Sequence, residues 1–566
     1  MVFGSSRGDV AIPEGEPAVD PNDRMAWVYS THVTIGDAGA ATSPTIKGSV
    51  YGSGENGHTF QNTIVDIKKG IVGITDTNID GGAAYAYRGN VYGGGCGTDK
   101  YDSNSDGIKD KYNPLAGIVQ GTTTINITGG QVVHNVYGAG AMGSVGGGAD
   151  ATSGKTTINI SGGRIGYDGD GNGHIFGAAR GEYGVSTAAS GLANVRETAV
   201  NINYTTTPTA DNDGKTAQLI AGSVFGGGEA GTVKESVAVN MTGGLILKDL
   251  YGGGALADTQ TDNWDATANE NAGGWADAEN KSTLHTTTVR LTGGRVGEEV
   301  FGGGLGEAGK PAYVWGDVLV DLNGTTPIDG TTHKPSTTGA VTTNTTGCVV
   351  GQIFGCNNIN GTPKGDVMVH VYATQSLNKA DISTKPDKNT NTYDVTAVYG
   401  GGNQAAYNPV TPYDGNSGSK TKVIIEGCDL SSIETVYGGG NAAAVPETDV
   451  YIKSAYEIGY LFGGGNGKDD IAPGVPNPGA DVGTPDHGTS TYGTGNANTL
   501  MEGGLIHEAY GGSNTRGLIK GSINQITAPK DPNVEPDCCE LKLEKIVGAG
   551  KYADIDGDVN MTLSCQ

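Results

Sequence analysis

The chain contains 566 residues and 99 of them are glycine, about two and a half times the roughly 7% of average usage, which excludes the composition of an ordinary enzyme. Its net charge of −26 repels nucleic acid and anionic lipid surfaces, so no nucleic-acid partner is expected. No window approaches about 18 uninterrupted apolar residues, so no transmembrane segment is expected in this chain.

The dominant feature is a phrase of one aliphatic residue, one Tyr or Phe, and one glycine, which recurs thirteen times. Neighbouring copies lie 25 to 53 residues apart, so the minimal repeat has about 25 residues and the longer repeats carry insertions. Rings stacked at repeat spacing would show their edges to solvent, so we expect them to pack, with the para positions facing water or a small gap. The aromatic residues of the phrase are Phe3, Tyr51, Tyr92, Tyr137, Phe176, Phe225, Tyr251, Phe301, Phe354, Tyr399, Tyr437, Phe462 and Tyr510.

The first long insertion contains a segment with oxygen-bearing side chains at alternate positions, which suits calcium and resembles the loops of dockerins and thrombospondin type 3 repeats. Carried over by position, the side chains of Asp102, Asn104, Asp106 and Asp110 and the carbonyl of Ile108 would be the ligands. The twelfth position is an asparagine rather than an acid, and a solvated turn is the alternative. A second stretch matches only the first half of this pattern, and its candidate ligands are Asp168, Asp170 and Asn172.

A second recurring phrase alternates apolar and polar residues and ends in a glycine pair. It occupies residues 124–130, 157–163, 237–244 and 288–294. Alternation of period two predicts a strand with one buried face, and the glycine pair predicts a corner with positive φ before a second short strand. No stretch has the 3.6-residue apolar period of a capped helix, so almost no helix is expected.

These two phrases predict an all-β fold, a single-stranded parallel β-helix (β-solenoid) of about 12–13 coils, which we expect to be right-handed. Stacking buries the apolar face of each short repeat against its neighbours. A β-propeller is disfavoured because repeats of 25 and 26 residues are too short for four-stranded blades. Disorder is disfavoured by the regular alternation.

The repeats predict one continuous array over residues 1–566. The chain starts inside one copy and ends on a strand phrase that lacks its aromatic partner, so we expect a segment of a longer array. Insertions after the glycine corners would emerge along one edge, where binding loops usually lie. They are expected near residues 102–118, 205–218, 257–282, 325–346, 373–394, 404–420 and 467–497.

Five successive repeats place asparagine four residues after the aromatic residue. Asparagine tolerates a corner conformation, and its amide can bond to the amide one coil away, so a structural ladder is expected and a ligand-binding amide row is the alternative. Earlier repeats hold other residues at this position, including Cys96, Arg180 and Glu229. The ladder residues are Asn358, Asn403, Asn441, Asn466 and Asn514.

The seven cysteines form no C-x-x-C pair, so zinc and redox motifs are not expected. Mostly free or buried thiols are the simplest interpretation. In an oxidising compartment, Cys348 and Cys356 are close enough in sequence to close a loop.

The phrase Val-Tyr-Gly-Gly-Gly-Asn at 398–403 and 436–441 resembles the glycine-rich β-helix repeat proteins of gut bacterial surfaces, which are similar in layout to autotransporter and adhesin β-helices. The resemblance covers nearly the whole chain, and its motifs specify a scaffold rather than an activity. It implies an extracellular or cell-surface, adhesin-like protein whose loops bind glycan or extracellular matrix.

The alternative is a polysaccharide-degrading β-helix, a lyase or glycoside hydrolase that uses Asp/Glu pairs as acid and base. Such an enzyme needs acids beside a cation on one coil. Asp317, Asp321 and Asp366 are expected to be exposed acids, but no basic residue recurs beside them. A binding or scaffolding role is therefore favoured over catalysis, and no catalytic residue is assigned.

Overall fold

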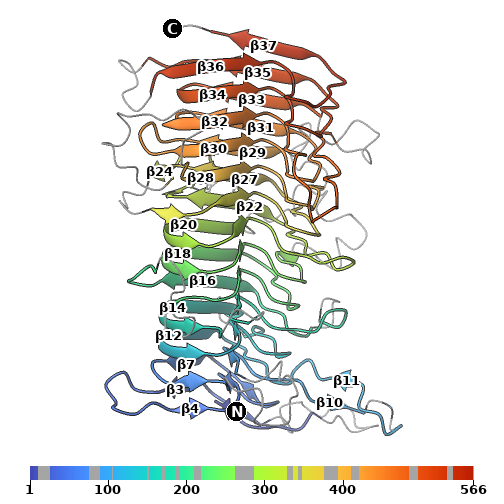
Figure 1. The fold of residues 1–566 in the computed structure, drawn as a ribbon. Helices are drawn as coiled ribbons and strands as arrows, with labels where there is room; N and C mark the ends of the chain where they lie inside the picture. The colour runs from blue at the N-terminus through green and yellow to red at the C-terminus, as the bar shows by residue number, and fades with distance from the viewer. Residues whose placement is uncertain are drawn as a thin grey trace. The chain divides into compact units, whose positions relative to one another are not determined.

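The computed structural model describes residues 1–10, 26–74, 89–102, 104, 106–148, 152–167, 172–186, 191–208, 218–261, 286–327, 335–341, 347–374, 393–409, 420–483, 495–531 and 539–564. These residues form strands, turns and bends, and none of them lies in an α-helix. The chain divides into two compact units, residues 1–261 and residues 262–566. Figure 1 shows the strands of each unit stacked in chain order.

In unit 1 the aromatic phrases form one row of parallel strands, called here the aromatic row. Each strand pairs with that of the next repeat, as Val136 does with Val91 and Ile175. The row consists of β1 (Val2–Phe3), β5 (Val50–Tyr51), β9 (Val91–Tyr92), β13 (Val136–Tyr137), β15 (Ile175–Phe176), β17 (Val224–Phe225) and β19 (Leu250–Tyr251).

The alternating phrases form a second parallel row in unit 1, called here the alternating row. Identical residues are paired in two neighbouring strands of this row, where Ile125 faces Ile158 and Ile127 faces Ile160. The row consists of β3 (Thr31–Ile35), β7 (Thr63–Ile67), β12 (Thr123–Val132), β14 (Lys155–Ile165), β16 (Glu197–Asn203) and β18 (Val237–Ile246), with β4 (Thr45–Ile46) and β8 (Ile71–Val72) continuing it beside the end of β12.

Unit 2 repeats both rows. Its aromatic row consists of β21 (Glu299–Phe301), β26 (Gln352–Phe354), β28 (Val395–Tyr399), β30 (Ser432–Tyr437), β32 (Glu457–Phe462), β34 (Gly504–Tyr510) and β36 (Leu541–Val547). Its alternating row consists of β20 (Thr286–Val296), β22 (Asp317–Leu322), β27 (Val367–Val371), β29 (Thr421–Ile425), β31 (Thr448–Ile452), β33 (Ala497–Met501), β35 (Ile523–Thr527) and β37 (Val559–Leu563), with β25 (Cys348–Val349) beside the end of β20.

Three shorter pairings complete the described strands. In unit 1, β2 (Trp27–Val28) pairs in parallel with β6 (His58–Thr59), and β10 (Lys100–Tyr101) forms an antiparallel hairpin with β11 (Lys111–Tyr112). In unit 2, β23 (Gly324–Thr325) and β24 (Ala340–Val341) form a second antiparallel hairpin. Both hairpins occupy predicted insertions. Of the other insertions, residues 209–217, 262–282, 375–392, 410–419 and 484–494 lie outside the described residues.

A third row of single-residue bridges lies between the aromatic strands and the alternating strands along the chain, and the sequence phrases did not predict it. In unit 2 parallel bridges connect Val445, Val482, Ile519 and Ile555 in turn. All-β structure and parallel sheets in chain order agree with the predicted β-solenoid class.

Alternation divides each strand between two faces because successive side chains in a strand point in opposite directions. In the alternating row the inward-facing apolar side chains of β12, such as Ile125 and Ile127, are fully buried. The leading threonines also point inward, and Thr156 Oγ1 donates to the carbonyl of Gly177 at 2.6 Å. Thr448 makes the same bond to Gly463 at 2.6 Å. These bonds satisfy buried carbonyls of the glycine corners.

The glycine pair behaves differently from the prediction. It was expected to separate two strands, but β12, β14, β18 and β20 run through it as continuous strands. The second glycine adopts positive φ, +75° at Gly130 and +79° at Gly163, and the pairing register of β12 with β14 shifts there. The pair therefore forms a bulge inside a long strand.

The aromatic residues form a continuous column in each unit. In unit 2 the ring centroids from Phe301 to Tyr510 are 4.5 to 5.1 Å apart, with interplanar angles of at most 10°. This spacing matches the distance of about 4.8 Å between paired strands. The residue before each ring is fully buried on the opposite face, as Val398 and Val436 are. The predicted packing role of the rings agrees with this column.

Candidate functional site

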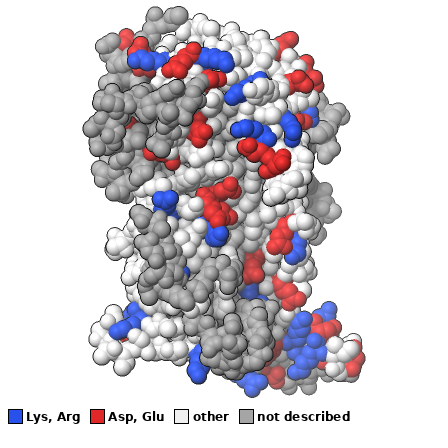
Figure 2. Space-filling view, viewed as in Figure 1, with Lys and Arg blue, Asp and Glu red and all other residues white. Residues whose placement is uncertain are grey.

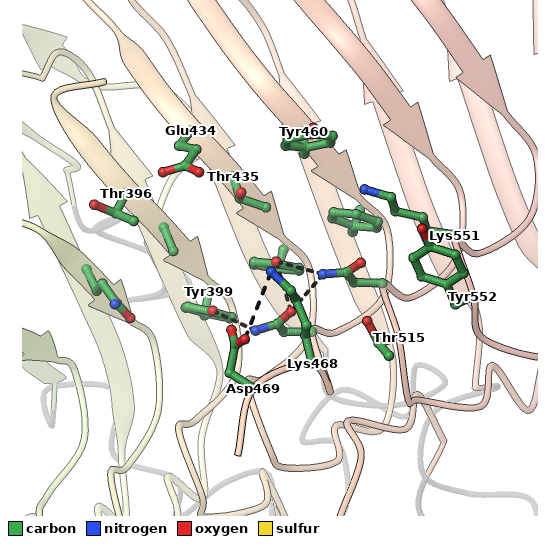
Figure 3. A pocket seen from close by; sticks show the side chains of 16 residues that line it. Thr396, Tyr399, Glu434, Thr435, Tyr460, Lys468, Asp469, Thr515, Lys551 and Tyr552 are labelled. Atoms are coloured by element: carbon green, nitrogen blue, oxygen red, sulfur yellow. Dashed lines mark hydrogen bonds and ion pairs between the residues drawn. The ribbon is translucent and has the colours of Figure 1, made fainter. Parts of the chain in front are cut away.

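Unit 2 contains a hollow of about 450 Å³ beside the aromatic row, called here the unit 2 groove. Its floor is formed by the column residues Tyr399, Tyr437 and Phe462. Figure 3 shows Lys468 and Asp469 near Tyr399, while Thr515, Lys551 and Tyr552 lie on the opposite side of the groove. Thr396, Glu434, Thr435 and Tyr460 project from the strands of the aromatic row along its other wall.

Two residues of the predicted amide ladder, Asn466 and Asn514, line this groove. Asn403 Nδ2 donates to Asn358 Oδ1 at 2.9 Å, and Asn441 donates to Asn403 at 2.8 Å. Asn466 and Asn514 continue the ladder with bonds of 2.9 Å each. Each side chain accepts from the next repeat and donates to the previous one, so the ladder ties five consecutive corners together.

The ladder also reaches the phenols of the column. Tyr437 Oη donates to Asn466 Oδ1 at 3.0 Å, and Asn466 Nδ2 donates to Tyr399 Oη at 3.3 Å. Burial raises the pKa of both phenols well above the usual value, so they stay protonated at neutral pH. These amides and phenols are therefore neutral donors and acceptors that bond to one another at the edge of the groove.

Charged and exposed aromatic side chains complete the unit 2 groove. Lys468 Nζ lies 3.9 Å from Asp469 Oδ1. Lys551 Nζ lies 4.5 Å from the centre of the Tyr460 ring, a cation–π distance. Tyr552 is 74% exposed, so most of its ring is open to a ligand. Lys551 stands four residues after Val547, which pairs with Tyr510, so it occupies the ladder position of the last repeat. The sequence analysis missed it because that repeat has no aromatic residue to mark the position.

Unit 1 has its own hollow at the equivalent corner, about 840 Å³ in volume and called here the unit 1 groove. The ladder position there carries no asparagine but Glu55, Cys96, Ala141, Arg180 and Glu229, all of which line the groove. Arg180 and Glu229, oppositely charged residues on neighbouring repeats, stand at this position in place of the amides. This groove therefore combines charges with phenols rather than amides with phenols.

Glu229 is an acid of this groove that bonds to a column phenol. Tyr137 Oη donates to Glu229 Oε2 at 2.6 Å. Burial raises the pKa of Glu229, opposed by the Tyr137 hydrogen bond and by the positive charge of Arg180. A second acid of the groove, Glu182, accepts a hydrogen bond from Tyr112 Oη at 2.5 Å. Asn172, one of the calcium candidates, lines the same groove, and its Oδ1 lies 2.9 Å from His134 Nδ1.

The candidates of the first calcium segment, residues 102–110, lie between the two strands of the β10–β11 hairpin. Asp102 accepts backbone N–H groups of Asn104, Asp106 and Gly107, and Asp106 accepts that of Ile108 at 2.8 Å. Asp110 donates its N–H to the Tyr101 carbonyl at 3.2 Å. Asp168 and Asp170 lie outside the described residues.

These carboxylates organise a turn rather than converge on a point. Among the residues that the structure describes, no group of three His, Cys, Asp or Glu side chains could hold a metal ion. Figure 2 shows blue and red side chains intermixed where Figure 1 labels this hairpin, so lysines share the surface with the acids. Calcium binding at this loop stays a prediction.

The acids expected to be exposed on β22 are buried. Asp317 is 2% exposed and Asp321 is fully buried. The prediction of exposure was wrong because the insertion that follows β22 returns over this strand, and Thr326 Oγ1 donates to Asp321 Oδ1 at 2.6 Å. Asp321 also has a basic partner, Arg290, whose Nε lies 3.3 Å from Oδ2. Burial raises the pKa of Asp321.

The disulfide also differs from the expected loop closure. Cys348 and Cys356 are free, buried thiols on different faces of the repeat, and burial raises their pKa. The bond instead links Cys428 to Cys539, whose Cα atoms are 5.5 Å apart across 111 residues of sequence. Stacking of the repeats brings Cys428 and Cys539 together although they are 111 residues apart, so their spacing in the sequence could not predict the bond.

A second ladder on the outer face of the alternating row of unit 1 was not predicted. Asn126 donates to Asp66 at 2.9 Å, and Asn159, Asn201 and Asn240 continue it at 2.9 to 3.0 Å. The signal was present, since the phrases at 124–130, 157–163 and 237–244 carry asparagine at their central outward position.

No family model, curated protein or solved structure matches this chain. Among the described residues there is no helix long and apolar enough to cross a membrane. The class that the fold defines is an all-β protein of parallel sheets whose strands follow the order of the repeats.

Proposed function

We propose that this chain is a right-handed β-solenoid of 12–13 coils that serves as an extracellular or cell-surface, adhesin-like scaffold and binds glycan or matrix polysaccharide. The observation that carries this proposal is the unit 2 groove, where neutral phenols and amides line a hollow next to an exposed ring. Sugars offer hydroxyl groups to such donors and acceptors and apolar ring faces to Tyr552.

The disulfide supports the proposed location. Disulfides persist in oxidising compartments and are rare in the cytosol of most organisms. The Cys428–Cys539 bond closes a loop of 111 residues in the chain and so restrains the unfolded state strongly. An anionic surface with interspersed lysines also fits a protein that works in solution or at a surface.

Glycan binding is tested by titrating the full chain with a panel of plant and mucin oligosaccharides. Tyr552→Ala and Lys551→Ala are expected to weaken binding about tenfold each, the equivalent of about 1.4 kcal/mol. Lys542→Ala is the matched control, because Lys542 is an exposed lysine that pairs with Glu540 at 3.1 Å and does not line the groove. Binding that is equally strong in all three variants contradicts the proposal.

One observation favours a second function, polysaccharide degradation. Glu229, Glu182 and Arg180 line the unit 1 groove together, which is the combination of acids and cation that such an enzyme needs. Burial raises the pKa of the Glu229 carboxyl group, and this is the direction that a general acid requires. Release of new reducing or unsaturated ends from a polysaccharide, lost in Glu229→Gln, would support this function and reject a purely adhesive role. Absence of turnover by the wild-type chain would reject the enzyme.

A further inference from the structure

Three aromatic side chains gather on the surface of unit 1, away from the buried column. Trp27, Tyr29 and Phe60 are 52%, 66% and 45% exposed. The ring of Phe60 lies 5.7 Å from that of Trp27 and 6.3 Å from that of Tyr29. The three rings therefore form one contiguous exposed cluster, called here the aromatic platform. Such a cluster marks an interaction site more often than isolated exposed residues do.

The backbone under the platform is fixed by strand pairing. Val28 of β2 faces Thr59 of β6 in the parallel ladder, which places Tyr29 and Phe60 at equivalent positions of neighbouring repeats. The N–H of Phe60 donates to the carbonyl of Val28 at 2.8 Å, and that of Gln61 to the carbonyl of Tyr29 at 2.7 Å. Because the rings stand on paired strands, the platform is formed before any ligand arrives, which lowers the entropy cost of binding.

The described segments that carry and flank the platform are polar but contain no charged carboxylate, ammonium or guanidinium group. The segments that carry it and flank it, residues 26–31, 58–63 and 118–122, contain no Asp, Glu, Lys or Arg, in a chain of which 17% is charged. The third segment is joined to the second by hydrogen bonds from Gln120 N to Thr59 O and from Gly121 N to Gln61 O. The exposed or half-buried polar groups of the second and third segments include the amides of Gln61, Asn62 and Gln120.

We propose that the aromatic platform binds a neutral polysaccharide chain. The C–H faces of pyranose rings would pack on Trp27, Tyr29 and Phe60, while the hydroxyl groups at the ring edges would bond to the flanking amides. A charged ligand would find no opposite charge in these segments, and desolvating it there would cost free energy. This site lies in unit 1 and shares no residue with either groove, so the proposal goes beyond the function proposed above.

The test is a titration of the full chain with cellohexaose, mannohexaose and xylohexaose, followed by calorimetry and tryptophan fluorescence. At least one of these neutral chains is expected to bind and to change the emission of Trp27. Trp27→Ala and Phe60→Ala should each weaken that binding at least tenfold. Because these rings are exposed, both variants should keep the thermal midpoint and far-ultraviolet circular dichroism of the wild type.

Matched variants separate this site from the unit 2 groove. Tyr552→Ala also removes an exposed ring, and platform binding should be unchanged in it. The proposal is overturned if none of the three neutral hexasaccharides binds, or if Trp27→Ala and Phe60→Ala leave binding intact. It is also overturned if hexagalacturonate binds as tightly as the neutral chains, or if the two variants abolish self-association of the protein instead, which would identify the platform as a protein interface.

Discussion

Gly438→Ala is expected to destabilise the protein by an amount at or above the upper end of the about 1–3 kcal/mol typical of overpacking. Gly438 follows the aromatic residue of its repeat, and a Cβ there would collide with the carbonyl oxygen of Gly463 in the next repeat. That carbonyl accepts a hydrogen bond from Thr448 Oγ1, so it has little freedom to move away. Urea unfolding followed by circular dichroism should show a lower midpoint.

Gly351→Ala is the matched control for this change. The nearest heavy atom to a Cβ at Gly351 is the carbonyl oxygen of Glu298 at 3.9 Å, an ordinary van der Waals contact. Its stability should therefore stay within about 0.5 kcal/mol of the wild type. Equal midpoints for the two alanine variants would show that the glycine of the aromatic phrase is not required by close approach of the repeats.

Phe354→Ala is expected to cost about 3–5 kcal/mol, the range for removing a buried phenylalanine. Phe354 is fully buried and stacks between Phe301 at 4.9 Å and Tyr399 at 4.5 Å. Its removal leaves a cavity in the column and removes two ring contacts, each worth about 0.5–1.5 kcal/mol beyond buried area. The measurement is again the midpoint of urea unfolding.

Phe354→Tyr should be tolerated, with a cost below about 1.5 kcal/mol, because tyrosine fills the same position in the next repeat. The phenol of Tyr399 accepts a hydrogen bond from the amide of Asn466, which lies two repeats further on. A tyrosine at position 354 would have Asn441 as the equivalent residue two repeats further on. If the tyrosine variant were as unstable as the alanine variant, the para position could not face the ladder as described.

Several features could be read from the residues because they depend on local geometry repeated many times. The aromatic phrase predicted strands, and all thirteen copies are strands of the aromatic rows. The spacing of four residues from Tyr399 to Asn403 placed the amides at one corner, where the hydrogen bonds of the ladder are found. A position that recurs in every repeat is in register with its neighbours once the repeats stack, so its contacts follow from the pattern.

Features that occur once were predicted poorly. The strand Leu541–Val547 was missed because it lacks an aromatic residue, although it pairs with β34 in register. The burial of Asp321 depends on the return of an insertion over its strand, and the Cys428–Cys539 bond depends on corners 111 residues apart. No local pattern encodes such contacts.

The printed residues alone were enough to determine an all-β chain, the strands of its two recurring phrases and its amide ladder, since each follows from alternation and spacing within about 25 residues. Only the tertiary structure decided where the grooves and the aromatic platform lie. Each of these sites includes side chains that do not recur from repeat to repeat, such as Tyr552 or Trp27, on segments that stacking brings into proximity. Their surroundings depend on which neighbours leave space and which carry charge, and these are properties of the packed surface rather than of any single repeat.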